Sequence, residues 1–294
     1  MRLIKPSFEI IEQQAGLEGV YKQIERAGRV SHKSEDRITE DSAKTFVERM
    51  KEMKHLSTCE FGTVYLYIDY HNPSFGKIID KYSSNEYSKC IVFPNEVYIS
   101  SNYRVLVENN WLNDLKYLCE PTKYHHKRYT VKFVLDRGIL AEFTRHRKFS
   151  FMAESTRYCN YSKGKFNSEL TFIIPCWMDI PEGSIDLGNY DKTSAGYNDG
   201  NIHIIDNKPP YVGVDFIRSL CEAEADYLSI VRNGWKPEQA RNVLPLSLKT
   251  ELYMCGFAED WEKFFELRCA ANSHPQAREL AIPLREEFIK RNYI

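Results

Sequence analysis

The stretch at residues 130–147 decides the fold, and it reads TVKFVLDRGILAEFTRHR. Its first part places Val131, Phe133 and Leu135 on one face of a predicted strand. The next two residues predict a turn, and residues 139–147 predict a short helix. A strand that leads into a helix in this way indicates that both element types share one domain.

Further elements follow from apolar spacing and from turn residues on either side of this stretch. The predicted strands cover residues 63–69, 130–136 and 171–174, and the predicted helices cover residues 39–54, 98–107, 111–118, 139–147, 216–231, 237–243 and 259–270, with a last helix from Pro275. Residues 70–95 and 181–210 predict loops. We therefore expect one α+β domain over residues 1–294, with a mixed or antiparallel sheet flanked by helices and a helical C-terminal half.

The composition excludes several classes of protein. Forty basic and forty-one acidic residues give a net charge of -1, which argues against a general polyanion binder. The chain has no signal-peptide pattern and no apolar run long enough to span a membrane, so we expect a soluble cytoplasmic protein. The eight cysteines include no Cys-x-x-Cys pair, which predicts reduced thiols and no metal site.

Residues 145–158 combine three arginines with apolar side chains, and they begin with Arg145, His146 and Arg147. A charged solvent-exposed segment would not interleave phenylalanines in this way, and a core segment would not carry three guanidinium groups. Arginine binds phosphate or carboxylate through two parallel hydrogen bonds. A loop Ser155 followed by Arg157 is also a common way to hold a phosphate. The segment therefore predicts a site for an anionic ligand beside an apolar wall.

On the predicted helix before this segment, Glu142 and His146 share a face because they are four residues apart. On the helix at residues 259–270, the apolar face of Trp261 and Phe264 continues to Arg268. A guanidinium in that position needs a partner, because an unpaired buried charge is costly. Either a ligand or a structural carboxylate, such as Glu266 or Glu279, could supply the partner. Arg241, at the end of a short predicted helix, is a further candidate anion ligand.

A basic stretch surrounds His125 and His126, with Lys123, Lys127 and Arg128 close by. It is consistent with a solvated surface or with binding of nucleic acid. The sequence contains neither Gly-x-Gly-x-x-Gly nor a Walker-type loop. Arginine side chains would therefore have to replace a glycine-rich cradle if a nucleotide binds.

Three segments together resemble the flavin-dependent thymidylate synthases. The first is Arg145-His146-Arg147, followed after seven residues by Ser155 and then by Arg157-Tyr158. The second is Arg241 with the Val-Leu-Pro-Leu that follows it, and the third is Leu267-Arg268 with His274 and Gln276. The similarity is clear over residues 130–175 and 235–282, whereas residues 70–125 and 181–212 look like insertions.

The resemblance implies reductive methylation of dUMP to dTMP. Methylenetetrahydrofolate would supply the carbon, NADPH the reducing equivalents, and FAD would carry the hydride. It also implies a homotetramer whose active sites are shared between subunits, with no nucleic acid or membrane as a partner. Two alternatives remain: methylation of a related pyrimidine nucleotide, or a noncatalytic protein that binds nucleotides or single-stranded nucleic acid.

The resemblance also assigns roles by position. Arg145, His146, Arg147 and Lys148 would contact FAD, and Arg268 would be the catalytic residue that stabilises negative charge on the pyrimidine ring. The residues implied for dUMP are Glu142, Arg145, Glu154, Ser155, Arg157, Arg241 and Arg268, with Arg241 coming from a neighbouring subunit.

Several positions depart from the family pattern. Glu142 stands where a glutamine is usual, and Met152-Ala153 replaces the usual Asn-Glu. Phe61 replaces a histidine that often contacts the flavin, and Phe257 and Lys263 replace two flavin-contacting asparagines. The flavin contacts outside the Arg-His-Arg motif are therefore expected to differ in this chain.

Overall fold

The computed structural model describes residues 1–185 and 212–294. Its centre is a four-stranded antiparallel sheet with the order β2-β6-β10-β7. The bounds are Ser7–Ile11 for β2, Arg128–Asp136 for β6, Ser150–Ala153 for β7 and Lys249–Phe257 for β10. Every residue of β10 pairs with β6, from Lys249 opposite Asp136 to Phe257 opposite Arg128. This pairing joins the two halves of the chain.

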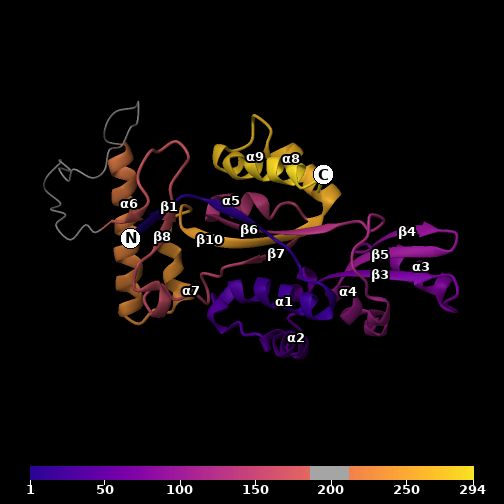
Figure 1. The fold of residues 1–294 in the computed structure, drawn as a ribbon. Coiled ribbons are helices and arrows are strands. Elements are labelled where there is room, and N and C mark those ends of the chain that lie inside the picture. The colour runs from indigo at the N-terminus through magenta and orange to yellow at the C-terminus, as the bar shows by residue number, and fades with distance from the viewer. Residues whose placement is uncertain (186–211) are drawn as a thin grey trace, which may run out of the picture.

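Helices cover both faces of this sheet (Figure 1). One face carries α5 (Arg137–Phe143), α8 (Ala258–Arg268) and α9 (Pro275–Lys290), and the other carries α1 (Gly16–Arg29) and α2 (Ser42–Glu52). As a result β10 is buried on both faces. Leu252 and Met254 face one core, and Tyr253 and Cys255 face the other.

The core beneath α8 and α9 is largely aromatic. Trp261 and Phe264 of α8 are fully buried against Phe133 of β6, Phe143 of α5 and Phe288 of α9. The rings of Phe143 and Phe264 meet edge to face with 5.0 Å between their centroids, a favourable geometry for aromatic pairs. This packing fixes α5 and α8 relative to each other.

A second sheet projects from one end of the molecule (Figure 1). It is antiparallel with the order β3-β5-β4, and a separate core packs against it. The elements are β3 (Thr63–Asp69), α3 (Phe75–Ser83), β4 (Lys89–Phe93), β5 (Glu96–Asn102) and α4 (Tyr103–Glu108). We call residues 63–108 the small-sheet module.

The opposite end contains a three-stranded sheet, in which β1 pairs in parallel with β8 and antiparallel with β9. Its core also packs against α6 and α7. The bounds are Arg2–Ile4 for β1, Thr171–Ile173 for β8, Gly183–Ser184 for β9, Val212–Arg232 for α6 and Pro237–Ala240 for α7. The predicted mixed or antiparallel sheet is thus three sheets.

The α+β class is confirmed, as are the strands β3, β6 and β8 and the helices α2, α6, α8 and α9. The predicted loop over residues 70–95 is wrong, because it contains α3 and β4, and the predicted helical piece over 98–107 is β5 followed by α4. The predicted helical C-terminal half also contains a strand that the sequence did not predict, β10. The predicted loop at 181–210 and the expected insertion at 181–212 lie almost entirely outside the described residues.

All eight cysteines carry free thiols, as predicted. Cys59, Cys159 and Cys255 are buried, and burial raises the pKa of the Cys59 thiol to about 11. Within residues 1–185 and 212–294, no helix is long and apolar enough to cross a membrane.

Truncation of Trp261 tests the aromatic core. Trp261→Ala should lower the free energy of unfolding by about 3–5 kcal/mol, because the cavity left behind cannot fully close. Trp235→Ala is the matched control, since the Trp235 side chain is 55% exposed and its loss should cost less than ~0.5 kcal/mol. Urea titrations of both variants measure the difference. Equal destabilisation by the two would contradict this description of the core.

Candidate functional site

Arg268, the last residue of α8, lies against the end of α5. Its Nη1 donates to Glu142 Oε2 over 2.7 Å, and its Nη2 donates to the main-chain oxygen of Glu142 over 2.6 Å. The Arg268 side chain is only 16% exposed. The guanidinium is therefore paired within the chain, but by Glu142 rather than by Glu266 or Glu279. Glu279 is instead half-buried near Asp136, and burial and that neighbouring charge raise its pKa to about 7.

The third partner of Arg268 is His146. Arg268 Nε donates to His146 Nε2 over 2.9 Å, so the ring proton of the neutral imidazole lies on Nδ1. Burial and, to a lesser extent, the charge of Arg268 lower the pKa of His146 to about 4. The imidazole is therefore a neutral hydrogen-bond acceptor near neutral pH.

The predicted helix over 139–147 is shorter than expected, because α5 ends at Phe143. Thr144 Oγ1 donates to the oxygen of Leu140 over 3.0 Å, and the chain then turns toward β7. Glu142 and His146 therefore do not share a helical face. They converge because the turn brings His146 back onto α8, where its ring lies 5.0 Å from that of Phe264.

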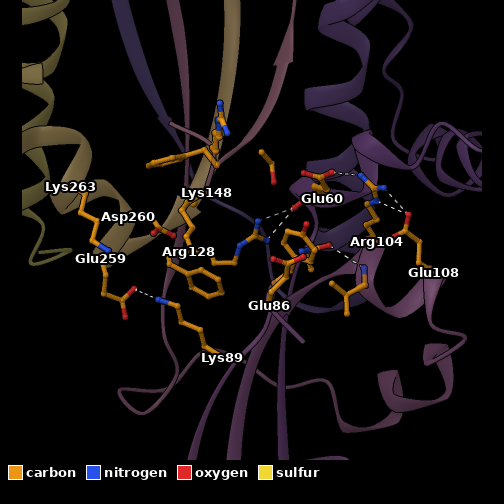
Figure 2. A pocket seen from close by; sticks show the side chains of 18 residues that line it. Glu60, Glu86, Lys89, Arg104, Glu108, Arg128, Lys148, Glu259, Asp260 and Lys263 are labelled. Atoms are coloured by element: carbon orange, nitrogen blue, oxygen red, sulfur yellow. Dashed lines mark hydrogen bonds and ion pairs between the residues drawn. The ribbon is translucent and has the colours of Figure 1, made fainter. Parts of the chain in front are cut away.

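A cavity of about 680 Å³ lies between the end of the central sheet and the small-sheet module (Figure 2). Arg147, Lys148 and Phe149 line it from the segment after α5, and Lys263 lines it from α8. Figure 2 shows Lys148 and Lys263 on one side and Arg104 and Glu108 on the other. The cavity therefore has walls from parts of the chain that are far apart in sequence.

Phe149 can occupy this position because Gly256 lies beneath its ring. A Cβ atom at Gly256 would come within 2.5 Å of Phe149 Cδ1, far inside contact distance. The Phe149 ring also meets that of Trp261 edge to face at 4.8 Å. Phe149 thus connects the lining of the cavity to the aromatic core.

Charges in the cavity are only partly paired. Lys89 forms an ion pair with Glu259 over 2.8 Å, and Arg104 pairs with Glu60 and Glu108. Arg128 donates to the main-chain oxygen of Glu60 and lies over the Phe257 ring at 5.6 Å. Among the described residues, Arg147, Lys148 and Lys263 have no side-chain hydrogen bond or ion pair. These three cations are free to meet an anion.

Glu154 follows β7 directly, within the arginine-rich segment 145–158, and its side chain is only 2% exposed. It forms an ion pair with Lys249 over 2.8 Å and accepts a hydrogen bond from Tyr161 over 3.1 Å. Lys249 also pairs with Glu251, whose pKa Lys249 and Lys33 hold well below its usual range despite burial. The Glu154 carboxylate is thus satisfied inside the protein.

Ser155 and Arg157 lie at the surface beyond Glu154. The Ser155 hydroxyl accepts from the main-chain nitrogen of Arg157 over 3.2 Å, which fixes a tight turn. The exposed Arg157 pairs with Glu238 of α7 over 3.1 Å, which brings this turn near Arg241, the residue that follows α7.

The predicted site residues therefore form two groups in one chain. The first contains Glu142, His146 and Arg268. Burial lowers the pKa of Arg268, the Glu142 carboxylate opposes this, and the charge of the nearby Arg145 lowers the pKa further. The second contains Ser155, Arg157 and Arg241. Among the described residues, no hydrogen bond or ion pair joins the two groups. Arg147 and Lys148 belong to neither, because they face the cavity.

The family model described as "Thymidylate synthase complementing protein" matches residues 95–291, which is more than half of the chain. The chain belongs to this family. The match contains both groups of site residues and the basic wall of the cavity. Most of the small-sheet module precedes it.

Two curated proteins are similar in sequence to this member of the family. A flavin-dependent thymidylate synthase of Synechocystis sp. is 25% identical over 162 residues, which is 55% of this chain and 66% of that protein. A probable flavin-dependent thymidylate synthase of Paramecium bursaria Chlorella virus 1 is 26% identical over 161 residues, with the same coverage of both chains. The chain thus spans somewhat less than two thirds of the length of these relatives.

Among solved structures, the family member is similar to the UMP/dUMP methylase PolB of Streptomyces cacaoi bound with 5-Br dUMP. The identity is 18%, the TM-score is 0.44, and the match covers 99% of this chain and 93% of PolB. A second PolB structure, bound with 5-Br UMP, gives 17% identity and the same TM-score, with 99% and 92% coverage.

Some cavity residues have little sequence signal. Arg128 looked like part of a solvated basic stretch, but its guanidinium reaches into the cavity, and the neighbouring His126 pairs with Glu259 over 2.6 Å. Tyr87 comes from a segment with no predicted structure. Of the family-variant positions, Phe257 and Lys263 line the cavity, whereas Phe61 is fully buried in the core behind β10.

The pKa of His146 tests the first group of residues. An NMR titration should give a pKa of about 4, so the ring stays neutral from about pH 6 upward. In Arg268→Gln the pKa should rise, because a neighbouring positive charge is gone. It should remain below 6.5, because burial, the larger cause, persists. An unchanged pKa in the variant would contradict the Arg268–His146 contact.

Proposed function

We propose that the protein is a flavin-dependent thymidylate synthase that methylates dUMP to dTMP. In this proposal methylenetetrahydrofolate donates the carbon, NADPH is the reductant and FAD is the cofactor. The observation that carries it is the meeting of Arg268 with Glu142 and His146, residues 126 and 122 positions away. Family membership and the flavin-dependent relatives give independent support.

The chemistry of the cavity fits a flavin nucleotide. Such a cofactor needs several hundred Å³, cations for its phosphates and flat apolar surfaces for its ring. The cavity is about 680 Å³ and contains the unpaired side chains of Arg147, Lys148 and Lys263, with Phe149 and Phe257 beside them. We assign Arg147 and Lys148 to the cofactor phosphates, with Arg145 and His146 on the side toward the substrate. When bound, the flavin supplies the hydride-transfer chemistry.

Arg268 is proposed to bind the pyrimidine ring and to stabilise negative charge on it. Three of its five N–H groups are used within the chain, so two remain for a ring oxygen. Because the site is partly buried, its charge is weakly screened and acts strongly on a neighbouring anion. The second Glu142 oxygen can accept a hydrogen bond from a ring N–H group, while the neutral His146 holds the guanidinium in position.

The phosphate of dUMP is assigned to the second group, Ser155, Arg157 and Arg241. Arg157 would exchange its exposed ion pair with Glu238 for the phosphate, an exchange with little cost because surface ion pairs are weak. Glu154 would act as a positioning residue, since its buried ion pair with Lys249 fixes the start of this turn. In this proposal the protein is a homotetramer in which each site takes residues from different subunits, as the family resemblance implies.

A related pyrimidine nucleotide is the second candidate substrate, and Glu142 is the reason to consider it. An ionised carboxylate only accepts hydrogen bonds, whereas the glutamine usual at this position both donates and accepts. The hydrogen-bonding groups that this site prefers on the pyrimidine base could therefore differ from those that the relatives prefer.

The visible spectrum tests the proposed function directly. The purified protein should show flavin absorbance, or acquire it with added FAD, and should oxidise NADPH faster when dUMP and methylenetetrahydrofolate are present. UMP in place of dUMP tests the second candidate. A colourless protein that neither binds FAD nor consumes NADPH would refute both, and salt-dependent binding to single-stranded nucleic acid would then favour a noncatalytic role.

Arg268→Ala tests the assigned catalytic residue. Turnover should fall by about 100-fold or more, as when a preorganised donor to a developing anion is removed. FAD affinity should be nearly unchanged, because Arg268 does not line the cavity. Arg285→Ala, an exposed arginine on the neighbouring α9, is the control and should keep full turnover. Unchanged turnover in Arg268→Ala would mean that the assigned role is wrong.

A further inference from the structure

The small-sheet module supplies much of one wall of the cavity from the same chain. Glu86 and Tyr87 line it from the turn between α3 and β4, Lys89 from β4, and Arg104 and Glu108 from α4. None of these residues belongs to the Arg-His-Arg segment or to the other two segments that carry the family resemblance. The module therefore lines the cavity with residues that lie outside the three segments of the family pattern.

Tyr87 is the feature of this wall that folding does not require. Its side chain is 59% exposed although it lines the cavity. The turn that carries it is nevertheless fixed. Asn85 Oδ1 accepts from the main-chain nitrogen of Tyr87 over 3.0 Å, and the Ser88 and Ser101 hydroxyls lie 2.8 Å apart in a hydrogen bond. An exposed aromatic ring on a fixed turn is a preorganised contact for another flat ring.

The two walls also contact each other directly. Glu259 of α8 pairs with Lys89 over 2.8 Å (Figure 2) and with His126 over 2.6 Å. The Lys89 ammonium lies 4.4 Å from the centroid of the Phe257 ring. These contacts tie β4 to α8 at the cavity. Tyr87, two residues before Lys89, thus lies in the part of the module that contacts α8.

The two walls differ in charge. Free cations, Arg147, Lys148 and Lys263, lie on the wall formed by the central sheet and α8. The first wall also carries Asp260 and the paired Glu259, and the module side carries the carboxylate of Glu86 beside Tyr87, with Glu108 paired to Arg104. Unpaired charge is thus mainly positive on the first wall and negative on the module side, where it would repel phosphate. A ligand with a phosphate at one end and an uncharged ring with sugar hydroxyls at the other would match both walls, because carboxylates accept hydrogen bonds from hydroxyl groups.

We propose that Tyr87 stacks on a ring of the bound flavin nucleotide, so that the small-sheet module forms part of the cofactor site. This inference rests on the proposed function, because it takes the cavity to be the flavin site. It assigns to the module a binding role that is independent of the Arg-His-Arg segment. The ring can be the isoalloxazine or the adenine, and the choice of probe distinguishes them.

The experiment measures binding to the full chain freed of flavin, with FAD, FMN and ADP as separate probes. Flavin absorbance and fluorescence report the first two, and calorimetry reports ADP. Tyr87→Ala should weaken FAD binding about tenfold, the usual effect of losing a base–aromatic stack. Tyr87→Phe should bind like the unchanged protein, because stacking does not need the hydroxyl. Tyr70→Ala is the matched control, since Tyr70 belongs to the same module, is 52% exposed and does not line the cavity.

Weaker binding of FAD and FMN but not of ADP would identify the isoalloxazine as the stacked ring, and weaker binding of FAD and ADP but not of FMN would identify the adenine. Either result supports the proposal. Affinities in Tyr87→Ala equal to those in Tyr70→Ala would overturn it while leaving the proposed function intact. If the unchanged protein binds no flavin at all, the proposed function itself fails.

Discussion

The pairing of β6 with β10 is the constraint on which the rest of the structure depends. It holds Asp136 opposite Lys249 at one end and Arg128 opposite Phe257 at the other. α5 follows β6 directly and α8 follows β10 directly, so the register of this pair determines where the two helices meet. Glu142 and Arg268 can form their ion pair only because the strands before them are aligned in this way. The aromatic core then locks the helices in that relation.

The charged residues of the arginine-rich segment, residues 145–158, lie in three different environments. His146 turns inward to Arg268, Arg147 and Lys148 face the cavity, and Arg157 reaches the surface beside α7. The cavity-facing residues are separated from Arg157 by β7, which pairs with β10, and by the buried Glu154, which pairs with Lys249. A buried carboxylate held by Lys249 and Tyr161 serves here to fix a turn. Its neighbours, and not Glu154 itself, are left open to a ligand.

The sequence predicted the strands whose apolar residues alternate and missed the central strand β10. β3 and β6 showed their apolar spacing, but β10 is buried on both sides, so Lys-Thr-Glu-Leu-Tyr-Met-Cys-Gly-Phe carries no simple alternation. For α3 the signal was present, since Phe75, Ile78 and Tyr82 lie at helical spacing. The need of Arg268 for a partner could be predicted, but not its identity. Glu142 becomes a neighbour only through strand pairing across the chain.

The long-range pairing of β6 and β10 also has a consequence for how the protein folds. Roughly 110 residues lie between Asp136 and Lys249, so their contact closes a long loop and belongs to the slow, non-local class of folding events. The cavity has walls on both sides of this closure and cannot exist before it. A ligand of the cavity would therefore bind only the fully folded chain, and it would raise the free energy of unfolding with the logarithm of its concentration. Ligand binding at the cavity and folding of the chain are therefore thermodynamically linked.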